Sequence, residues 1–224
     1  MYGIAGSYKG STSLSESENF GSIPSPAARN LWYDQVMKKV YIIHGYGGYP
    51  GKNWFPWLKE KLERYNIEVI IPAMPNTESP DFKNWISHLQ FVINKPNKDT
   101  YLVGHSLGCI SILRYLETLQ QDEKVGGVIL VAGFVSPIHF SELDEFTKAP
   151  INEGKIKSIV SNIIAISSDN DPHIPYTQAE EIRDYLSAKL ITVPNGGHLN
   201  EKSGYTDFPL VFEELVKMMG LDPL

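Results

Sequence analysis

The stretch TYLVGHSLGCISILRYLETLQ, residues 100–120, decides the fold. It opens with the apolar run 101–103, which predicts a short buried strand, and it ends with apolar residues at helical spacing. Between them lies Gly104–Gly108, a G-x-S-x-G sequence with Ser106 at its centre. A serine between a strand and a helix is typical of a nucleophile elbow, where the side chain projects from a sharp turn. We expect a side chain in place of either glycine to collide with the neighbouring strand or helix.

The composition limits the class of protein. The chain has 224 residues, 42% of them hydrophobic and 21% charged, which fits one globular domain with a sizeable core. A net charge of −6 argues against a nucleic-acid partner, and no apolar run is long enough to span a bilayer. The first residues show no basic segment followed by an apolar one, so we expect no secretory signal, and the single Cys109 cannot form an internal disulfide. We therefore expect a cytoplasmic protein, monomeric by default, with no nucleic-acid or membrane partner.

From residue 39 onward, apolar runs alternate with helical patterns. Residues 1–38 are rich in Gly, Ser and Pro, so we expect an extension, flexible or laid over the surface, before a domain spanning 39–224. The connection at 133–158 is unusually long, and it is either a small cap over the site or a plain helical connection. The alternation predicts an α/β fold, a parallel sheet of about six strands with helices on both faces. The predicted strands are 40–43, 68–73, 101–103, 127–132, 162–167 and 189–193.

Polar residues follow four of the predicted strands, at the edge of the sheet where ligand sites gather. Residues 44–46 follow the first strand, Ser106 the third, 168–175 the fifth, and His198 the sixth. The chain order Ser, Asp, His is that of the α/β-hydrolase arrangement. We expect His198 to take the proton of Ser106, because a serine hydroxyl needs a base and an imidazole titrates near neutral pH.

Two aspartates compete to orient His198. Asp171 begins a D-x-x-I-P sequence before a predicted helix and is favoured, in part by the resemblance given below. Asp169 is the alternative, and its other reading is a turn residue that caps the loop. The predicted oxyanion donors are the backbone N–H of Leu107, at a helix N-terminus, and that of Tyr46 after the first strand.

Aromatic residues gather near the predicted rim of the site. Tyr46, Trp54 and Phe134 are candidate substrate contacts, with Tyr49 and Phe140 nearby, and they suggest an apolar or aromatic acyl site. The alternative is that these rings pack between helices, which is the favoured interpretation for Trp54. Histidine pairs at metal-ligand spacing with cysteine or acidic partners are absent, so we expect no metal and no other cofactor.

Several segments resemble a known group of enzymes. YIIHGYGG, YLVGHSLGC, LDEFT, DPHIP and NGGHLNEKSGYTDFP are similar to the small YdeN-like serine hydrolases, which are related to the family of retinoblastoma-binding protein nine. The similarity covers about residues 39–220, and residues 1–38 have no counterpart. The resemblance implies a minimal α/β-hydrolase fold with Ser106, Asp171 and His198 as catalytic triad, and activity on small acyl esters or amides.

Two classes of function are therefore open. The first is a carboxylesterase-like hydrolase that cleaves a small ester, thioester or amide through an acyl-enzyme on Ser106. The second is a protein-binding module on a hydrolase scaffold, because fold does not fix function. The complete set of three catalytic groups favours the first class and a small-molecule acyl substrate.

Overall fold

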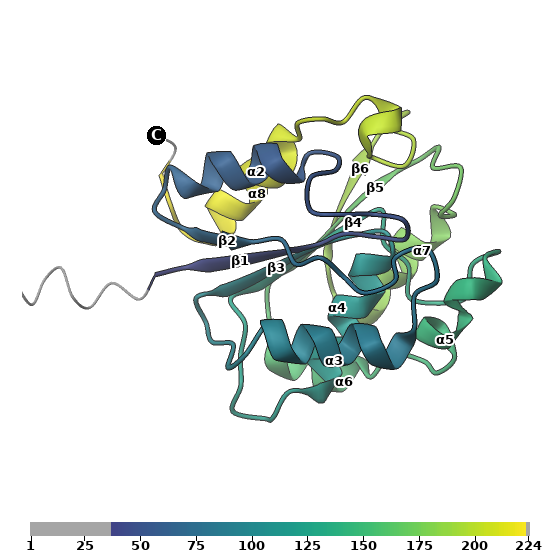
Figure 1. The fold of residues 1–224 in the computed structure, drawn as a ribbon, viewed down its shortest axis with the longest axis horizontal. Helices are drawn as coiled ribbons and strands as arrows, with labels where there is room; N and C mark the ends of the chain where they lie inside the picture. The colour runs from purple at the N-terminus through teal and green to yellow at the C-terminus, as the bar shows by residue number, and fades with distance from the viewer. Residues whose placement is uncertain (1–36, 223–224) are drawn as a thin grey trace, which may run out of the picture. The chain divides into compact units, whose positions relative to one another are not determined.

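The computed structural model describes residues 37–222, so most of the predicted extension 1–38 lies outside the described residues. Six parallel strands form one sheet in the order β2-β1-β3-β4-β5-β6 (Figure 1). The predicted number and direction of strands are confirmed. The strands are β1 (Lys39–Ile43), β2 (Glu68–Ile70), β3 (Thr100–His105), β4 (Gly127–Val131), β5 (Ile163–Ser168) and β6 (Lys189–Val193).

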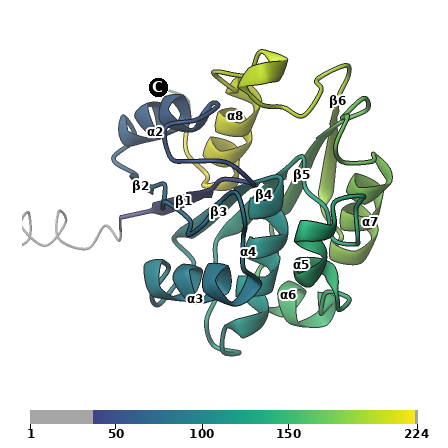
Figure 2. The same cartoon turned by 45° about the vertical axis from the view of Figure 1, so that its right-hand side comes forward.

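Helices cover both faces of the sheet, as predicted. In Figure 1, α2 and α8 lie above the sheet and α3, α4 and α6 lie below it; in Figure 2, α5 and α7 lie on the same side as α3 and α4. None of the helices within residues 37–222 is long and apolar enough to cross a membrane. The helices are α2 (Phe55–Glu63), α3 (Phe82–Val92), α4 (Leu107–Thr118), α5 (Asp144–Thr147), α6 (Glu153–Ile159), α7 (Thr177–Leu186) and α8 (Pro209–Met218), with 3-10 turns η1 (Ser141–Leu143) and η2 (Glu201–Ser203).

Strand β4, in the middle of the sheet, is buried at all five positions and carries no polar side chain, because both of its sides face a core. Along β4, Val128 and Leu130 pack into the core with α3 and α4, whereas Ile129 and Val131 pack into the core with α2 and α8. All four side chains are fully buried. Burial of one such side chain contributes about 1.5–3 kcal/mol, so the two cores hold the sheet between its helices.

Strand β2 is shorter than the predicted 68–73. It lies at the edge of the sheet and pairs with β1 only from Glu68 to Ile70. Pro72 follows two residues later, and its missing N–H cannot continue a ladder. The chain therefore leaves the sheet early and runs toward the carboxyl edge.

Most of the long connection 133–158 belongs to the helical layer. Leu143, Phe146 and Ile156 are buried in the core that contains α4. The guanidinium of Arg114, on α4, donates to the carbonyl of Phe146 at 2.9 Å. The second half of the connection is thus a packed helical segment, and only its first part, which includes Phe140, lies near Tyr46.

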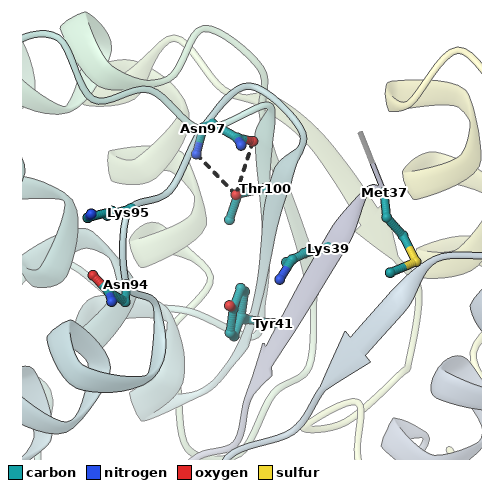
Figure 3. A pocket seen from close by; sticks show the side chains of 7 residues that line it. All are labelled: Met37, Lys39, Tyr41, Asn94, Lys95, Asn97 and Thr100. Atoms are coloured by element: carbon teal, nitrogen blue, oxygen red, sulfur yellow. Dashed lines mark hydrogen bonds between the residues drawn. The ribbon is translucent and has the colours of Figure 1, made fainter. Parts of the chain in front are cut away.

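A cavity of about 250 Å³ lies at the amino ends of β1 and β3 (Figure 3). Its polar groups are partly paired with one another or with neighbours: Asn97 N–H donates to the Thr100 hydroxyl at 3.1 Å, and Lys39 forms an ion pair with Glu68 at 2.9 Å. The residues predicted to act chemically follow the carboxyl ends of the strands instead, at the opposite edge. The cavity is lined by Met37, Lys39, Tyr41, Asn94, Lys95, Asn97 and Thr100.

Candidate active site

Ser106 occupies a strained turn between β3 and α4. Its backbone angles are φ 55° and ψ −122°, a conformation that residues with a Cβ rarely adopt. Two backbone hydrogen bonds hold the turn: Ser106 N–H donates to the carbonyl of Val131 at 2.9 Å, and Cys109 N–H donates to the carbonyl of Ser106 at 2.9 Å. The turn is therefore tied both to the neighbouring strand and to its own helix.

The two glycines of the elbow permit close approach of backbone. A Cβ at Gly108 would lie 2.1 Å from the carbonyl oxygen of Ile43 in β1. A Cβ at Gly104 would lie 2.8 Å from the backbone nitrogen of Cys109 in α4. Both distances are far below van der Waals contact, so the predicted collisions with strand and helix are confirmed.

The loop after β1 lies directly against the elbow. A Cβ at Gly45 would lie 2.9 Å from the Ser106 Cβ and 3.4 Å from the Leu107 nitrogen. Among the hydrogen bonds of residues 37–222, the N–H groups of Tyr46 and Leu107 donate to no protein group. Leu107 begins α4, where unpaired amides and the helix dipole favour a negative charge. Two backbone donors are thus available in the segments that meet beside Ser106.

His44 holds this loop in place. The N–H of Met74 donates to His44 Nε2 at 3.2 Å, so the ring proton is on Nδ1, which donates to the carbonyl of Gly45 at 3.1 Å. Burial lowers the pKa of His44. The neutral ring therefore connects the β1 loop to the segment that follows β2.

Asp171 is the carboxylate that contacts His198. Its Oδ2 lies 2.7 Å from His198 Nδ1, and its Oδ1 accepts the backbone N–H groups of His173 at 2.8 Å and Ile174 at 3.1 Å. Burial by itself would raise the pKa of Asp171, but the hydrogen bond and charge of His198 with the two amide donors lower it below its ordinary value. Asp171 stays ionised and fixes the proton of His198 on Nδ1.

Asp169 has a different partner. Its Oδ1 accepts the N–H of Asn195 at 2.7 Å. The neighbouring Ser168 and Asn170 side chains likewise accept the N–H groups of Gly196 at 2.8 Å and Gly197 at 2.7 Å. The loop after β5 therefore shapes the loop that carries His198. The cluster of short polar side chains at 168–171 was the visible signal in the sequence, but it did not indicate which backbone groups they would bind.

Trp54, just before α2, also supports the loop that carries His198. Its indole N–H donates to the carbonyl of Leu199 at 3.0 Å, and its side chain is fully buried. Asn53 and Glu201 add a reciprocal pair of backbone-to-side-chain bonds, at 3.3 and 3.2 Å. The structure agrees with the favoured interpretation of Trp54 as a packing residue: the indole is buried and holds a loop, so Trp54 is not available as a substrate contact.

Of the other two predicted substrate contacts, Phe134 is buried and Tyr46 is partly exposed. Phe134 is fully buried in the core with α4, so it differs from the expectation because the helical layer covers it. Tyr46 is half-buried, its hydroxyl donates to the carbonyl of Glu78 at 2.8 Å, and its ring meets that of Phe140 edge to face at 5.0 Å. Phe140 and Tyr49 are exposed, at 36% and 55%. Tyr46 and Phe140 are therefore the aromatic pair left at the surface.

The single cysteine, Cys109, is a buried packing residue with an unreactive thiol. Cys109 is fully buried, and its thiol donates to the carbonyl of Val131 at 3.3 Å. Burial raises the pKa of the thiol. Within the part of the chain that the structure describes, three or more His, Cys, Asp or Glu side chains are nowhere grouped so as to hold a metal ion.

Several known proteins are similar to this chain in sequence and in fold. YdeN of Bacillus subtilis (strain 168) is 38% identical over 181 residues, which cover 80% of this chain and 95% of that protein. The serine hydrolase RBBP9 of Rattus norvegicus is 27% identical over 186 residues, which cover 81% of this chain and 93% of that protein. The crystal structure of the B. subtilis ydeN gene product matches with a TM-score of 0.80 and 37% identity, over 82% of this chain and all of that one.

The family assignment follows from two independent matches. A family model described as "Serine hydrolase" matches residues 40–217, which is most of the chain. The sheet order and helical layers described above agree with the structural match to the ydeN product, which confirms the predicted α/β-hydrolase fold. The chain belongs to the serine hydrolase family and is a hydrolase of the α/β-hydrolase fold.

Proposed function

We propose that this hydrolase cleaves a small carboxylic ester, or a thioester or amide, through an acyl-enzyme on Ser106. The observation that carries the proposal is the 2.7 Å contact between His198 Nδ1 and the buried carboxylate of Asp171. It leaves Nε2 of His198 as the basic nitrogen. Ser106 lies in the strained turn between β3 and α4 (φ 55°, ψ −122°), whereas Ser187, the other serine with positive φ among the described residues, ends α7 in the ordinary left-handed conformation. A serine in such a turn and a histidine with a basic Nε2 supply the chemistry of a nucleophile and its base.

In the acylation step, His198 Nε2 takes the proton of Ser106 as Oγ attacks the carbonyl carbon of the substrate. Asp171 stabilises the imidazolium that results, and the N–H groups of Tyr46 and Leu107 donate to the oxyanion of the tetrahedral intermediate. The intermediate then collapses, the bond to the leaving group breaks, and His198 returns the proton to that group. The products of this step are the free alcohol, thiol or amine and an ester on Ser106.

Deacylation repeats the sequence with water as nucleophile. His198 takes a proton from water as its oxygen attacks the acyl-enzyme, and the same two amides bind the oxyanion. Collapse of the second intermediate returns the proton to Ser106 Oγ and releases the carboxylic acid. The enzyme is thereby regenerated, and the reaction consumes only the substrate and one water molecule.

The surface near Ser106 favours an apolar acyl group of short or medium length. Tyr46 and Phe140 come from different loops and meet edge to face at 5.0 Å. Their partly exposed rings offer apolar contact area close to the β1 loop that carries the oxyanion donor. This combination of a small apolar surface and acyl-transfer groups supports carboxylesterase-like activity.

Hydrolysis of p-nitrophenyl acetate, butyrate, octanoate and palmitate tests the proposal. We expect turnover by the wild type, highest for the short and medium esters, and none above background for Ser106→Ala. Ser158→Ala is the matched control, because Ser158 is an exposed serine on α6 whose hydroxyl bonds only its own helix. Absence of wild-type turnover on every ester, or equal turnover by Ser106→Ala, would refute the proposed reaction.

A further inference from the structure

A buried histidine lies directly against His198. His105 is the last residue of β3, immediately before Ser106, and it is only 4% exposed. Its Nε2 lies 2.9 Å from the backbone carbonyl oxygen of His198, and the two ring centroids are 4.9 Å apart. Because a carbonyl oxygen only accepts, Nε2 of His105 must carry the proton and donate it.

The surroundings keep His105 neutral. The rings of Trp54 and Phe55 meet it edge to face, at centroid distances of 6.3 and 6.1 Å. Burial lowers its pKa to about 3, and the charges of His198 and Lys52 act in the same direction, whereas the hydrogen bond to the His198 carbonyl and the charge of Asp171 oppose the shift. His105 is therefore neutral at neutral pH, where its Nε2–H is committed to the carbonyl of His198 and the ring does not act as an acid or base toward substrate.

A second histidine, His173, contacts the His198 ring without a side-chain hydrogen bond to its backbone, so it allows the two interactions to be tested separately. His173 also meets the His198 ring edge to face, at 5.0 Å, but its side chain is exposed. Its backbone N–H donates to Asp171, and this bond does not depend on the side chain. The two neighbours thus offer the same ring contact to His198, whereas only His105 holds the backbone of His198.

We propose that His105 is a positioning residue for the reaction, which holds the carbonyl of His198 and so sets the distance between that imidazole and Ser106. This inference rests on the proposed function. The last residue of the buried strand β3 carries the donor, and the next residue is the nucleophile, so one rigid strand end fixes both partners of the proton transfer. Displacement of a catalytic group by roughly 1 Å costs about 100-fold in rate, which is the effect expected when this bond is lost.

The matched pair His105→Gln and His105→Met tests the hydrogen bond. Both side chains are unbranched and of similar length, but only glutamine can donate at the position of Nε2. For p-nitrophenyl acetate we expect His105→Met to lower kcat about 100-fold with little change in KM, and His105→Gln to retain most of the wild-type kcat. The pH of half-maximal kcat/KM should stay the same in His105→Gln, because His105 itself does not titrate there.

Three results would overturn the proposal: equal losses in the Gln and Met variants, no loss in the Met variant, or an equally large loss in His173→Ala, which removes only a ring contact. An NMR readout keeps the test independent of turnover. In wild type and His105→Gln we expect a low-field proton signal from His198 Nδ1–H, whereas in His105→Met it should broaden or disappear; an unchanged signal contradicts the proposal. If the signal is present in wild type and His105→Gln and is lost in His105→Met, but the wild type hydrolyses no ester, the proposed function fails while the positioning contact stands.

Discussion

Asp169 and Asp171 lie two residues apart in one loop and have different partners. Asp171 binds the His198 ring, whereas Asp169 accepts the backbone N–H of Asn195. Asp171→Asn should lower kcat by about 10⁴-fold, because an amide no longer stabilises the imidazolium or fixes the tautomer. Asp169→Asn keeps an acceptor oxygen and should change kcat far less. A larger loss at Asp169, measured as ester hydrolysis at pH 7, would reverse these roles.

Gly108 is the residue at which a single methyl group has the largest predicted effect on folding. Its Cβ would meet the backbone of β1 at 2.1 Å, where neither side can move away. Gly108→Ala should reduce the free energy of unfolding by about 3 kcal/mol or more. Gly154→Ala, in α6, is the control: its Cβ has ordinary contact distances of 3.8 Å, and it should be neutral or stabilising by up to about 1 kcal/mol.

Urea unfolding followed by circular dichroism measures both glycine variants. Equal stability of the Gly108 and Gly154 variants would mean that α4 and β1 are not packed as closely as described. The elbow would then have room to relax, and the strained backbone of Ser106 would not be enforced by its neighbours.

At the scale of elements, the loop after β6 depends on the start of α2. Trp54→Phe keeps the buried ring but removes the indole donor to Leu199. It should cost about 1 kcal/mol in stability and lower kcat several-fold, because the adjacent His198 loses a restraint. Trp57→Phe is the control, since Trp57 is half-buried against Phe212 at 6.2 Å, and within residues 37–222 none of its hydrogen bonds or ring contacts reaches that loop. If both variants have the same kcat, Trp54 does not position the loop.

The elements themselves could be predicted from the sequence, and their long-range hydrogen bonds could not. Apolar runs and helical spacing are local signals, and they located all six strands and the polar residues after them. Strand β2 was predicted too long because Ile71 continues the apolar run although Pro72 ends the pairing.

The partners of Trp54 and His105 lie 145 and 93 residues away in the chain, so no local pattern encodes them. Residue type alone makes Phe134 a candidate substrate contact and favours packing for Trp54; in the structure both side chains are fully buried. The sequence indicated which residues follow the strands; only the arrangement of the loops separates Asp171, which binds His198, from Asp169, which shapes the backbone.

At the scale of the whole molecule, buried neutral histidines make stability depend on pH. His105 protonates near its ordinary pKa of 6.5 when the chain is unfolded but only at about 3 when it is folded. Between these values the unfolded state binds more protons, so the free energy of unfolding falls as the pH falls. The lowered pKa of His44 acts in the same direction, whereas the contribution of Asp171, whose pKa is lowered from 3.8, is lost as the pH falls from about 3.8 downward.

The pH dependence of stability can be measured against His105→Gln. Between pH 7 and pH 5, urea unfolding of the wild type should lose about 2 kcal/mol more than that of His105→Gln, because glutamine does not titrate. The other titrating groups are common to both proteins and cancel in the difference. Parallel pH profiles would show that His105 is not held neutral in the folded protein.

Ser106 is proposed to be a nucleophile that His198 activates. The most direct measurement is the mass of the intact protein after treatment with a fluorophosphonate, followed by peptide mapping of the adduct. We expect one phosphonyl group on Ser106 in the wild type, none in Ser106→Ala, and strongly slowed labelling in Asp171→Asn. An unlabelled wild type, or an adduct on another residue that persists in Ser106→Ala, would contradict the account.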